Sequence, residues 1–335
     1  MNVDAINGWG NISLNSGLNT DIVIGGSEPI VMAPAKPFFG PSTGGTITIN
    51  TASKDLTVNT SFLIAGTLNM NVGAGRTLTA NGAVNWWSDQ FDTTASLNKQ
   101  GDGTVVLAAA NNYQGVTTIS GGTLNAATFS DYGVNGSLGN PVSDDSGNVG
   151  ILFQGGTLQY TGSTAQSTNR AIRISTNGGA TIDASGSVST ATLSFTATSS
   201  PDFFENPGNR SLTLTGSNTG ANTFGMAIGE AGGTTSVVKN GAGKWVLTGT
   251  NSYTGNTTLN GGTLRLGNGT SNSAGGNTAD VTVDSGCTLN LNYTGTDTID
   301  ELWLGGVQKS PGVYGSGNSG GLITGAGTLT VTNGP

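Results

Sequence analysis

The chain has 335 residues, of which 57 are glycine and only 9% carry a charged side chain. It contains no histidine, which excludes Ser-His-Asp and Cys-His catalytic sites and metal sites with histidine ligands. The net charge is −8 and the 11 basic residues are spread thinly, so we expect no nucleic-acid partner.

Residues 1–44 are predicted to form an irregular N-terminal cap or docking segment. Asp21 is followed by three apolar residues in a row, Ile22 to Ile24, which suits a strand buried on both faces or an end cap. Proline cannot donate to a sheet ladder, and four prolines come next: Pro29, Pro34, Pro37 and Pro41. The start lacks the basic and apolar runs of a signal peptide, and no stretch has the apolar length of a membrane span.

Short strands separated by turns begin at residue 45. Threonine, valine and isoleucine favour strands, and they recur at residues 45–50, 56–58, 66–72 and 76–79. Residues 86–91, with Trp86 and Trp87, interrupt this pattern.

Residues 101–124 and 241–264 are two copies of one repeat, which superimpose without a gap when 140 is added to each number of the first. They share Gly-x-Gly-x-x-x-Leu, Asn-x-Tyr-x-Gly-x-Thr-Thr and Gly-Gly-Thr-Leu, and a lysine lies just upstream in each, Lys99 or Lys239. Each copy reads as strand, turn, strand, turn, strand. One such coil cannot bury its apolar face alone, so we expect coils to stack with backbone hydrogen bonds at about 4.8 Å.

These motifs resemble the autotransporter-associated β-strand repeat of autotransporter passengers and large bacterial surface proteins. The resemblance implies an all-β fold, a single right-handed parallel β-helix with loop insertions and end-capping segments. It also implies an extracellular or cell-surface location in bacteria, with the signal sequence not present in this chain. It implies no catalytic residue, because the repeat is a scaffold signature.

The rest of the chain continues the pattern. We predict a protruding loop or short helix over residues 131–150 and a second insertion over 201–208, with strands on both sides of each. Residues 292–335 resemble the segment that closes such proteins. No linker separates domains, so the sequence favours one continuous solenoid over residues 1–335.

Carboxylates are the remaining candidates for catalysis. Glycosidases need two carboxylates about 5–10 Å apart. The candidate pairs are Asp89 with Asp92, Asp144 with Asp145, and Asp300 with Glu301. We interpret them as solvated turn residues and expect no catalytic residue, cofactor or metal ion. A loop calcium site around Asp131, Asp144 and Asp145 is the alternative, because carboxylate and amide oxygens suit Ca²⁺.

Three further features have a plain structural explanation. Cys287 is the one cysteine, and we expect a small core residue, with an intermolecular bridge as the alternative. Tyr113 and Tyr253 belong to the repeat and are predicted to pack at a corner. Asparagines that recur after strands are expected to form amide ladders between coils.

The remaining aromatic residues could pack loops and ends or hold glycans: Trp86, Trp87, Phe91, Phe203, Phe204, Trp303 and Tyr314.

The sequence favours a non-enzymatic structural protein, acting as a surface stalk, an adhesin or a filament subunit. A solenoid has two ends with unpaired strand edges, so end-to-end self-association is expected if they are not capped. A glycan-binding module and a polysaccharide-active β-helix enzyme are the alternatives, because fold alone does not fix function. Any adhesive partner would be a glycan or another cell-surface molecule.

Overall fold

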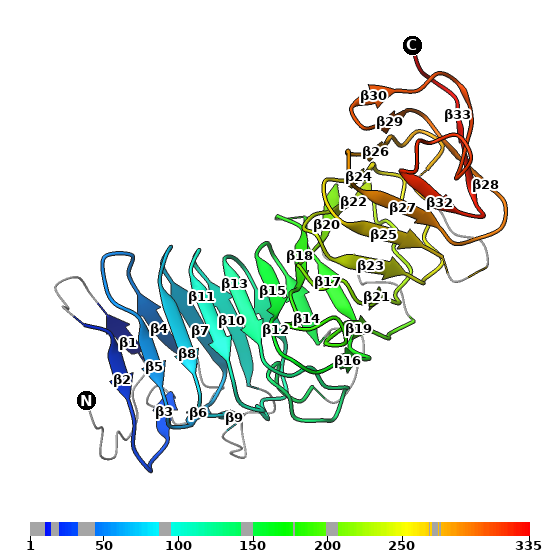
Figure 1. Cartoon of the computed structure of the whole chain (residues 1–335). Helices are drawn as coiled ribbons and strands as arrows, with labels where there is room; N and C mark the ends of the chain where they lie inside the picture. The colour runs from blue at the N-terminus through cyan, green and yellow to red at the C-terminus, as the bar shows by residue number, and fades with distance from the viewer. Residues whose placement is uncertain are drawn as a thin grey trace. The chain divides into compact units, whose positions relative to one another are not determined.

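A computed structural model describes residues 11–14, 20–32, 44–86, 95–141, 150–176, 178–198, 207–267, 269, 274 and 276–335. These residues form β-strands joined by turns, with no helix among them. The chain divides into two compact units (Figure 1): unit 1 is Met1–Tyr160 with Thr168–Ile172, and unit 2 is Thr161–Ser167 with Arg173–Pro335. The short strands β16 (Gln166–Thr168) and β17 (Ile172–Ile174) each cross this division in the sequence.

Unit 1 is built from parallel sheets in which neighbouring strands come from successive coils (Figure 1). The first sheet runs in the order β1 (Asn11–Leu14), β4 (Gly45–Ile49), β7 (Thr67–Val72), β10 (Ser96–Gln100), β12 (Thr117–Ile119) and β14 (Ile151–Phe153). The second runs β2 (Ile22–Ile24), β5 (Leu56–Val58), β8 (Thr77–Ala80), β11 (Thr104–Leu107), β13 (Thr123–Ala126) and β15 (Thr157–Tyr160). The third is short and runs β3 (Ile30–Met32), β6 (Phe62–Ile64) and β9 (Val84–Trp86).

The register places like residues above one another. In β7, Leu68, Met70 and Val72 point inward and are completely buried, while the alternate residues are partly exposed. Met70 lies beside Ile47 of the preceding coil, so buried side chains stack in columns. Burying an aliphatic side chain of this size contributes about 1.5–3 kcal/mol, which makes these columns the main source of stability.

Unit 2 repeats this architecture. One parallel sheet runs β18 (Ala180–Ala184), β20 (Arg210–Thr215), β22 (Thr235–Lys239), β24 (Thr257–Leu259), β26 (Val281–Val283) and β29 (Leu302–Leu304). Another runs β19 (Leu193–Phe195), β21 (Asn222–Phe224), β23 (Lys244–Leu247), β25 (Thr263–Leu266), β27 (Thr288–Leu291) and β32 (Ile323–Gly325).

The parallel pattern changes near the C-terminus of unit 2. Strand β30 (Val307–Gln308) turns back and pairs antiparallel with β29. Strand β33 (Thr328–Val331) pairs in parallel with β28 (Thr296–Ile299) and antiparallel with β31 (Gly312–Tyr314). The last coil therefore ends in short antiparallel returns rather than in another parallel strand.

The N-terminal stretch is more regular than the sequence predicts. Within residues 1–44, β1, β2 and β3 pair in parallel with β4, β5 and β6. The described part of this segment therefore contains regular strands, because the apolar runs Ile22–Ile24 and Ile30–Met32 pair with the next coil despite the nearby prolines. Its role as a cap or docking segment stays a prediction. Val23 is 50% exposed, so β2 is not buried on both faces. Pro34, Pro37 and Pro41 lie outside the described residues.

The predicted all-β parallel solenoid is confirmed in both units. Its right-handed winding and its continuity over residues 1–335 stay predictions. Of the predicted loop at 131–150, residues 131–141 and 150 are described, and they contain turns but no helix. Only residues 207 and 208 of the second insertion are described. No helix in the described parts is long and apolar enough to cross a membrane.

Candidate functional site

The two repeats place the same side chains in the same surroundings. With the strand that carries the upstream lysine, the first repeat comprises β10 to β13 and the second β22 to β25. In both, the first two strands pair in parallel with the last two. Tyr113 and Tyr253 are completely buried, which confirms that they pack inside their corners. Each hydroxyl lies 2.8 Å from a threonine hydroxyl, that of Thr117 or Thr257. Burial raises the pKa of both tyrosines above its ordinary value, so they are neutral hydrogen-bonding groups at physiological pH.

A buried asparagine braces each repeat against the coil before it. The Asn111 amide oxygen accepts a hydrogen bond from the Val84 N–H at 2.7 Å, and the Asn251 oxygen accepts one from the Ile228 N–H at 3.0 Å. Sequence reasoning assigned these residues to turns only. They also satisfy backbone N–H donors that would otherwise be buried without a partner.

The lysine upstream of each repeat is a feature to which the sequence assigned no role. Lys99 and Lys239 are completely buried, and each ammonium donates to three backbone carbonyl groups. Burial lowers the pKa of each to about 8. The strand alternation held the signal, because Lys99 is two residues beyond the buried Leu97 and therefore faces inward.

A buried arginine holds the loop that follows the first repeat. Arg170 is 1% exposed, and its guanidinium donates to the carbonyl groups of Leu138 at 2.7 Å and Gly139 at 2.8 Å. It also donates to the Ser130 hydroxyl at 2.8 Å and to the Val134 carbonyl at 3.1 Å. Burial lowers the pKa of Arg170, but a guanidinium keeps its charge in proteins. The side chain is thus committed to holding the loop.

The one candidate carboxylate pair in the described residues already takes part in structural contacts. Asp300 accepts a hydrogen bond from the Asn333 amide at 2.8 Å, and Glu301 accepts one from the Trp303 indole at 3.0 Å. Asp280 lies near both, and burial together with the Glu301 charge raises its pKa. The other two pairs, Asp89 with Asp92 and Asp144 with Asp145, lie outside the described residues.

The described residues give no support for a metal site. They contain no group of three or more acidic, cysteine or histidine side chains that could hold an ion. Asp131, proposed for calcium, accepts a hydrogen bond from the Asn169 N–H at 2.7 Å, while its suggested partners are not described. Cys287 is 4% exposed, as a core residue should be, and burial raises the pKa of its thiol.

The aromatic residues named as glycan candidates are partly accounted for by packing. Trp86 and Trp303 are only partly exposed, and Tyr314 donates to the Ser310 carbonyl at 2.9 Å. Trp87, Phe91, Phe203 and Phe204 lie outside the described residues. Whether any of these aromatic side chains holds a glycan stays a prediction.

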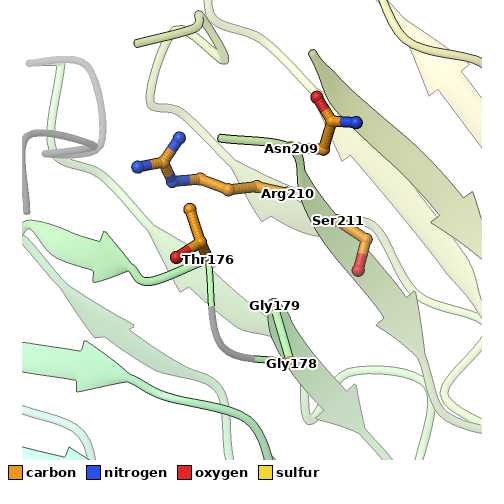
Figure 2. A pocket seen from close by; sticks show the side chains of 6 residues that line it. All are labelled: Thr176, Gly178, Gly179, Asn209, Arg210 and Ser211. Carbon is orange, nitrogen blue, oxygen red and sulfur yellow. The ribbon is translucent and has the colours of Figure 1, made fainter. Parts of the chain in front are cut away.

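Unit 2 contains a shallow hollow of about 270 Å³, shown in Figure 2. It is lined by Thr176, Gly178, Gly179, Asn209, Arg210 and Ser211. Arg210 is 5% exposed and donates to the carbonyl groups of Ile174 and Gly208 at 2.8 and 2.7 Å. The Arg210 guanidinium thus stabilises the backbone beside the hollow by donating to backbone carbonyl groups. Arg170 donates to backbone carbonyl groups in the same way in unit 1, where it holds the loop that follows the first repeat.

Amide ladders cross the coils as predicted. Asn81 donates to Asn59 at 2.8 Å in unit 1, and Asn260 donates to Asn240 at 2.8 Å in unit 2. These bonds, like the buried ones, join one coil to the next. In the described residues, the chemistry that the repeats carry serves cohesion between coils.

Comparison with known proteins agrees with this geometry. Residues 97–126 and 237–266 match the family described as "Passenger-associated-transport-repeat", and these ranges start two residues before Lys99 and Lys239. The chain is 36% identical over 196 residues to the "Adhesin BmaC autotransporter" of Brucella suis biovar 1 (strain 1330). The match covers 58% of this chain and 5% of that protein, so the chain spans a small part of its relative. No solved structure matches.

Proposed function

We propose that this chain, which carries two passenger-associated transport repeats, is part of the surface-exposed passenger of a bacterial autotransporter adhesin. The observation that carries the proposal is the match of both repeats to a passenger family. The similarity to an autotransporter adhesin supports it further. Both point to an extracellular or cell-surface location, and a passenger role does not require catalysis.

The role within such a protein would be mechanical. The repeated side chains, such as Tyr113, Asn111 and Lys99, are buried; Asn111 and Lys99 bind neighbouring coils, and Tyr113 bonds within its own corner. A protein whose distinctive residues all serve cohesion is suited to holding a binding surface away from the cell. We therefore propose a non-enzymatic stalk or adhesin segment.

The end structure favours a stalk over a filament subunit. In unit 2, antiparallel strands β30 and β31 take the places where a further parallel coil would pair. Such returns blunt an open sheet edge and hinder docking of a second solenoid. End-to-end self-association stays the competing arrangement. Electron microscopy and sedimentation of the purified chain should show single particles at high concentration, and regular fibres would favour the filament.

Adhesion is tested with beads that carry the purified chain. We expect them to attach to epithelial cells or to immobilised glycans more than beads carrying the same chain after heat denaturation. A glycan array then identifies a carbohydrate partner, or leaves another cell-surface molecule as the partner. Attachment no greater than that of the denatured control would contradict the adhesive role. Release of reducing ends from polysaccharides would contradict the non-enzymatic one.

A further inference from the structure

The lysine upstream of each repeat is an unusual buried charge. Lys99 and Lys239 have no exposed surface, and lysine is rarely buried without a counter-charge. Their described hydrogen-bond partners are all backbone carbonyl oxygens. The same arrangement in two units indicates a feature of the repeat rather than a local accident.

The two ammonium groups have nearly identical geometry. In the first repeat, Nζ of Lys99 donates to the carbonyl groups of Gln100, Gly101 and Gly121 at 2.8, 2.8 and 3.0 Å. In the second, Nζ of Lys239 lies 2.6, 2.8 and 3.0 Å from its acceptors. These acceptors are the carbonyl groups of Asn240, Gly241 and Gly261. An ammonium has three N–H donors and no acceptor, so three carbonyl groups satisfy it completely.

The three carbonyl groups belong to two successive coils. Gln100 and Gly101 end β10 and begin its turn, whereas Gly121 lies in the turn after β12, the next strand of the sheet. Gly101 has φ of +70°, and a Cβ there would approach the Val72 oxygen to 2.4 Å. Only glycine allows the chain to pass so close, and the stacked corners bring the carbonyl groups together.

Charge and shape fit a small cation with hydrogen-bond donors. Burial lowers the pKa of both lysines to about 8, and the groups that act on them electrostatically are Asp102 for Lys99 and Cys287 for Lys239. The carbonyl dipoles act against this burial effect, because they accept hydrogen bonds from the charged form. A neutral amine has two N–H groups and would leave one carbonyl oxygen without a donor.

We propose that each repeat contains a binding site for a primary ammonium ion, formed by three corner carbonyl groups of two successive coils. The repeat's own lysine occupies this site and locks the two coils together. The lysine acts as a tethered cation, and its chain of methylene groups fills the space between the strand and the corner. This inference does not depend on the adhesive role proposed above.

The site is tested by removing the lysine side chain and supplying a free primary ammonium ion in solution. Lys239→Ala and Lys99→Ala each remove three carbons and the nitrogen, which together correspond to n-propylammonium. We expect each variant to melt at least 5 °C below the parent chain, a shift of about 2 kcal/mol or more for a cooperative unit of this size. n-Propylammonium should restore at least half of that loss with a saturable dependence. Tetramethylammonium at equal concentration, which has the charge but no N–H donor, should restore none.

Two controls make the result decisive. Lys244→Ala removes a partly exposed lysine of the same repeat, and it should neither lower the melting temperature as far nor respond to n-propylammonium. Lys239→Met fills the space without donors and should stay destabilised in n-propylammonium. Equal recovery with tetramethylammonium would overturn the proposal. So would a Lys239→Met variant as stable as the parent, an outcome that remains measurable if the alanine variants do not fold.

Discussion

The two repeats share an inner framework and differ in what surrounds it. Both keep the lysine, the asparagine brace and the tyrosine–threonine pair at matching distances. In the first repeat the loop over residues 128–141 covers the corner, and Thr117 donates to Leu138 in that loop at 3.2 Å. In the second, Thr257 donates to the carbonyl of Ala274 instead. The framework therefore tolerates different coverings as long as each buried hydroxyl finds an acceptor.

The two repeats also differ in their second strand, which is β11 in the first repeat and β23 in the second. Val105 of β11 and Trp245 of β23 occupy equivalent positions, and both are completely buried. The Trp245 indole donates to the Thr215 carbonyl at 2.8 Å, a bond that valine cannot make. Lys99 is influenced by Asp102, whereas Lys239 is influenced by Cys287. Each difference offers a way to test which part of the repeat carries its stability.

The largest effect is expected from Arg170, which holds the loop that follows the first repeat. Arg170→Met keeps the bulk of the side chain but removes the donors to Leu138, Gly139 and Val134. Each buried carbonyl left without a donor costs about 1–3 kcal/mol, so we expect the free energy of unfolding to fall by about 3–5 kcal/mol. Urea denaturation measures the loss, and hydrogen exchange should locate it in residues 128–141 and spare the second repeat.

The matched control for this change is Lys54→Met, also in unit 1. Lys54 is partly exposed, and substitution there should change stability by no more than about 0.5 kcal/mol. If Arg170→Met cost as little as Lys54→Met, the arginine would not be what holds the loop.

Exchanging the strand residue should have the next largest effect. Trp245→Val gives the second repeat the residue of the first, but it leaves a cavity and removes the bond to Thr215. We expect a loss of about 3 kcal/mol in the free energy of unfolding. The reverse change, Val105→Trp, should overpack the first repeat and cost about 1–3 kcal/mol. A loss below about 1 kcal/mol for Trp245→Val would show that the coil can collapse around valine.

The backbone architecture was predictable because it follows from short-range patterns. The Gly-Gly-Thr-Leu motif gives a corner and then a strand with one inward leucine, as Leu124 and Leu264 confirm. Asparagines after successive strands predicted the ladders that Asn59 and Asn81 form. These features depend only on residues that recur at fixed positions of a coil.

The contacts that sequence reasoning missed depend on distant or non-repeating segments. Arg170 binds carbonyl groups that lie more than 30 positions earlier, in a loop without periodicity. Lys99 is a charged residue at an inward position, which hydrophobic patterning treats as an error unless its partners are known. Those partners are backbone carbonyl oxygens of stacked corners, so no pattern of side chains in the sequence identifies them.

The buried lysines should make stability rise with pH above neutrality. Their pKa is about 8 in the folded chain and about 10.4 when unfolded, so the unfolded chain binds more protons between these values. Stability therefore increases through this window, by about 1 kcal/mol for each lysine between pH 7.5 and 9. Urea denaturation at several pH values measures the slope. Lys99→Met and Lys239→Met should each remove about half of it.

This measurement needs Cys287→Ala in the parent chain. Burial raises the pKa of the Cys287 thiol, so its stabilising contribution is lost as pH rises and would oppose the lysine effect. With the thiol removed, a flat or falling stability between pH 7.5 and 9 would contradict the lowered lysine pKa. An unequal contribution from Lys99 and Lys239 would measure how strongly Asp102 favours the charged form.

The smallest effect is expected from the amide ladders, one in each unit. Asn81→Ala and Asn260→Ala each remove one exposed bond of 2.8 Å between coils. Cross-strand pairs of this kind contribute about 0.2–1 kcal/mol, so both losses should be near 0.5 kcal/mol and alike. Asn251→Ala is the comparison, because it leaves the buried Ile228 N–H without its acceptor and should cost more, about 1–3 kcal/mol. Equal losses for Asn260→Ala and Asn251→Ala would mean that the ladders, not the buried frameworks, set the cohesion between coils.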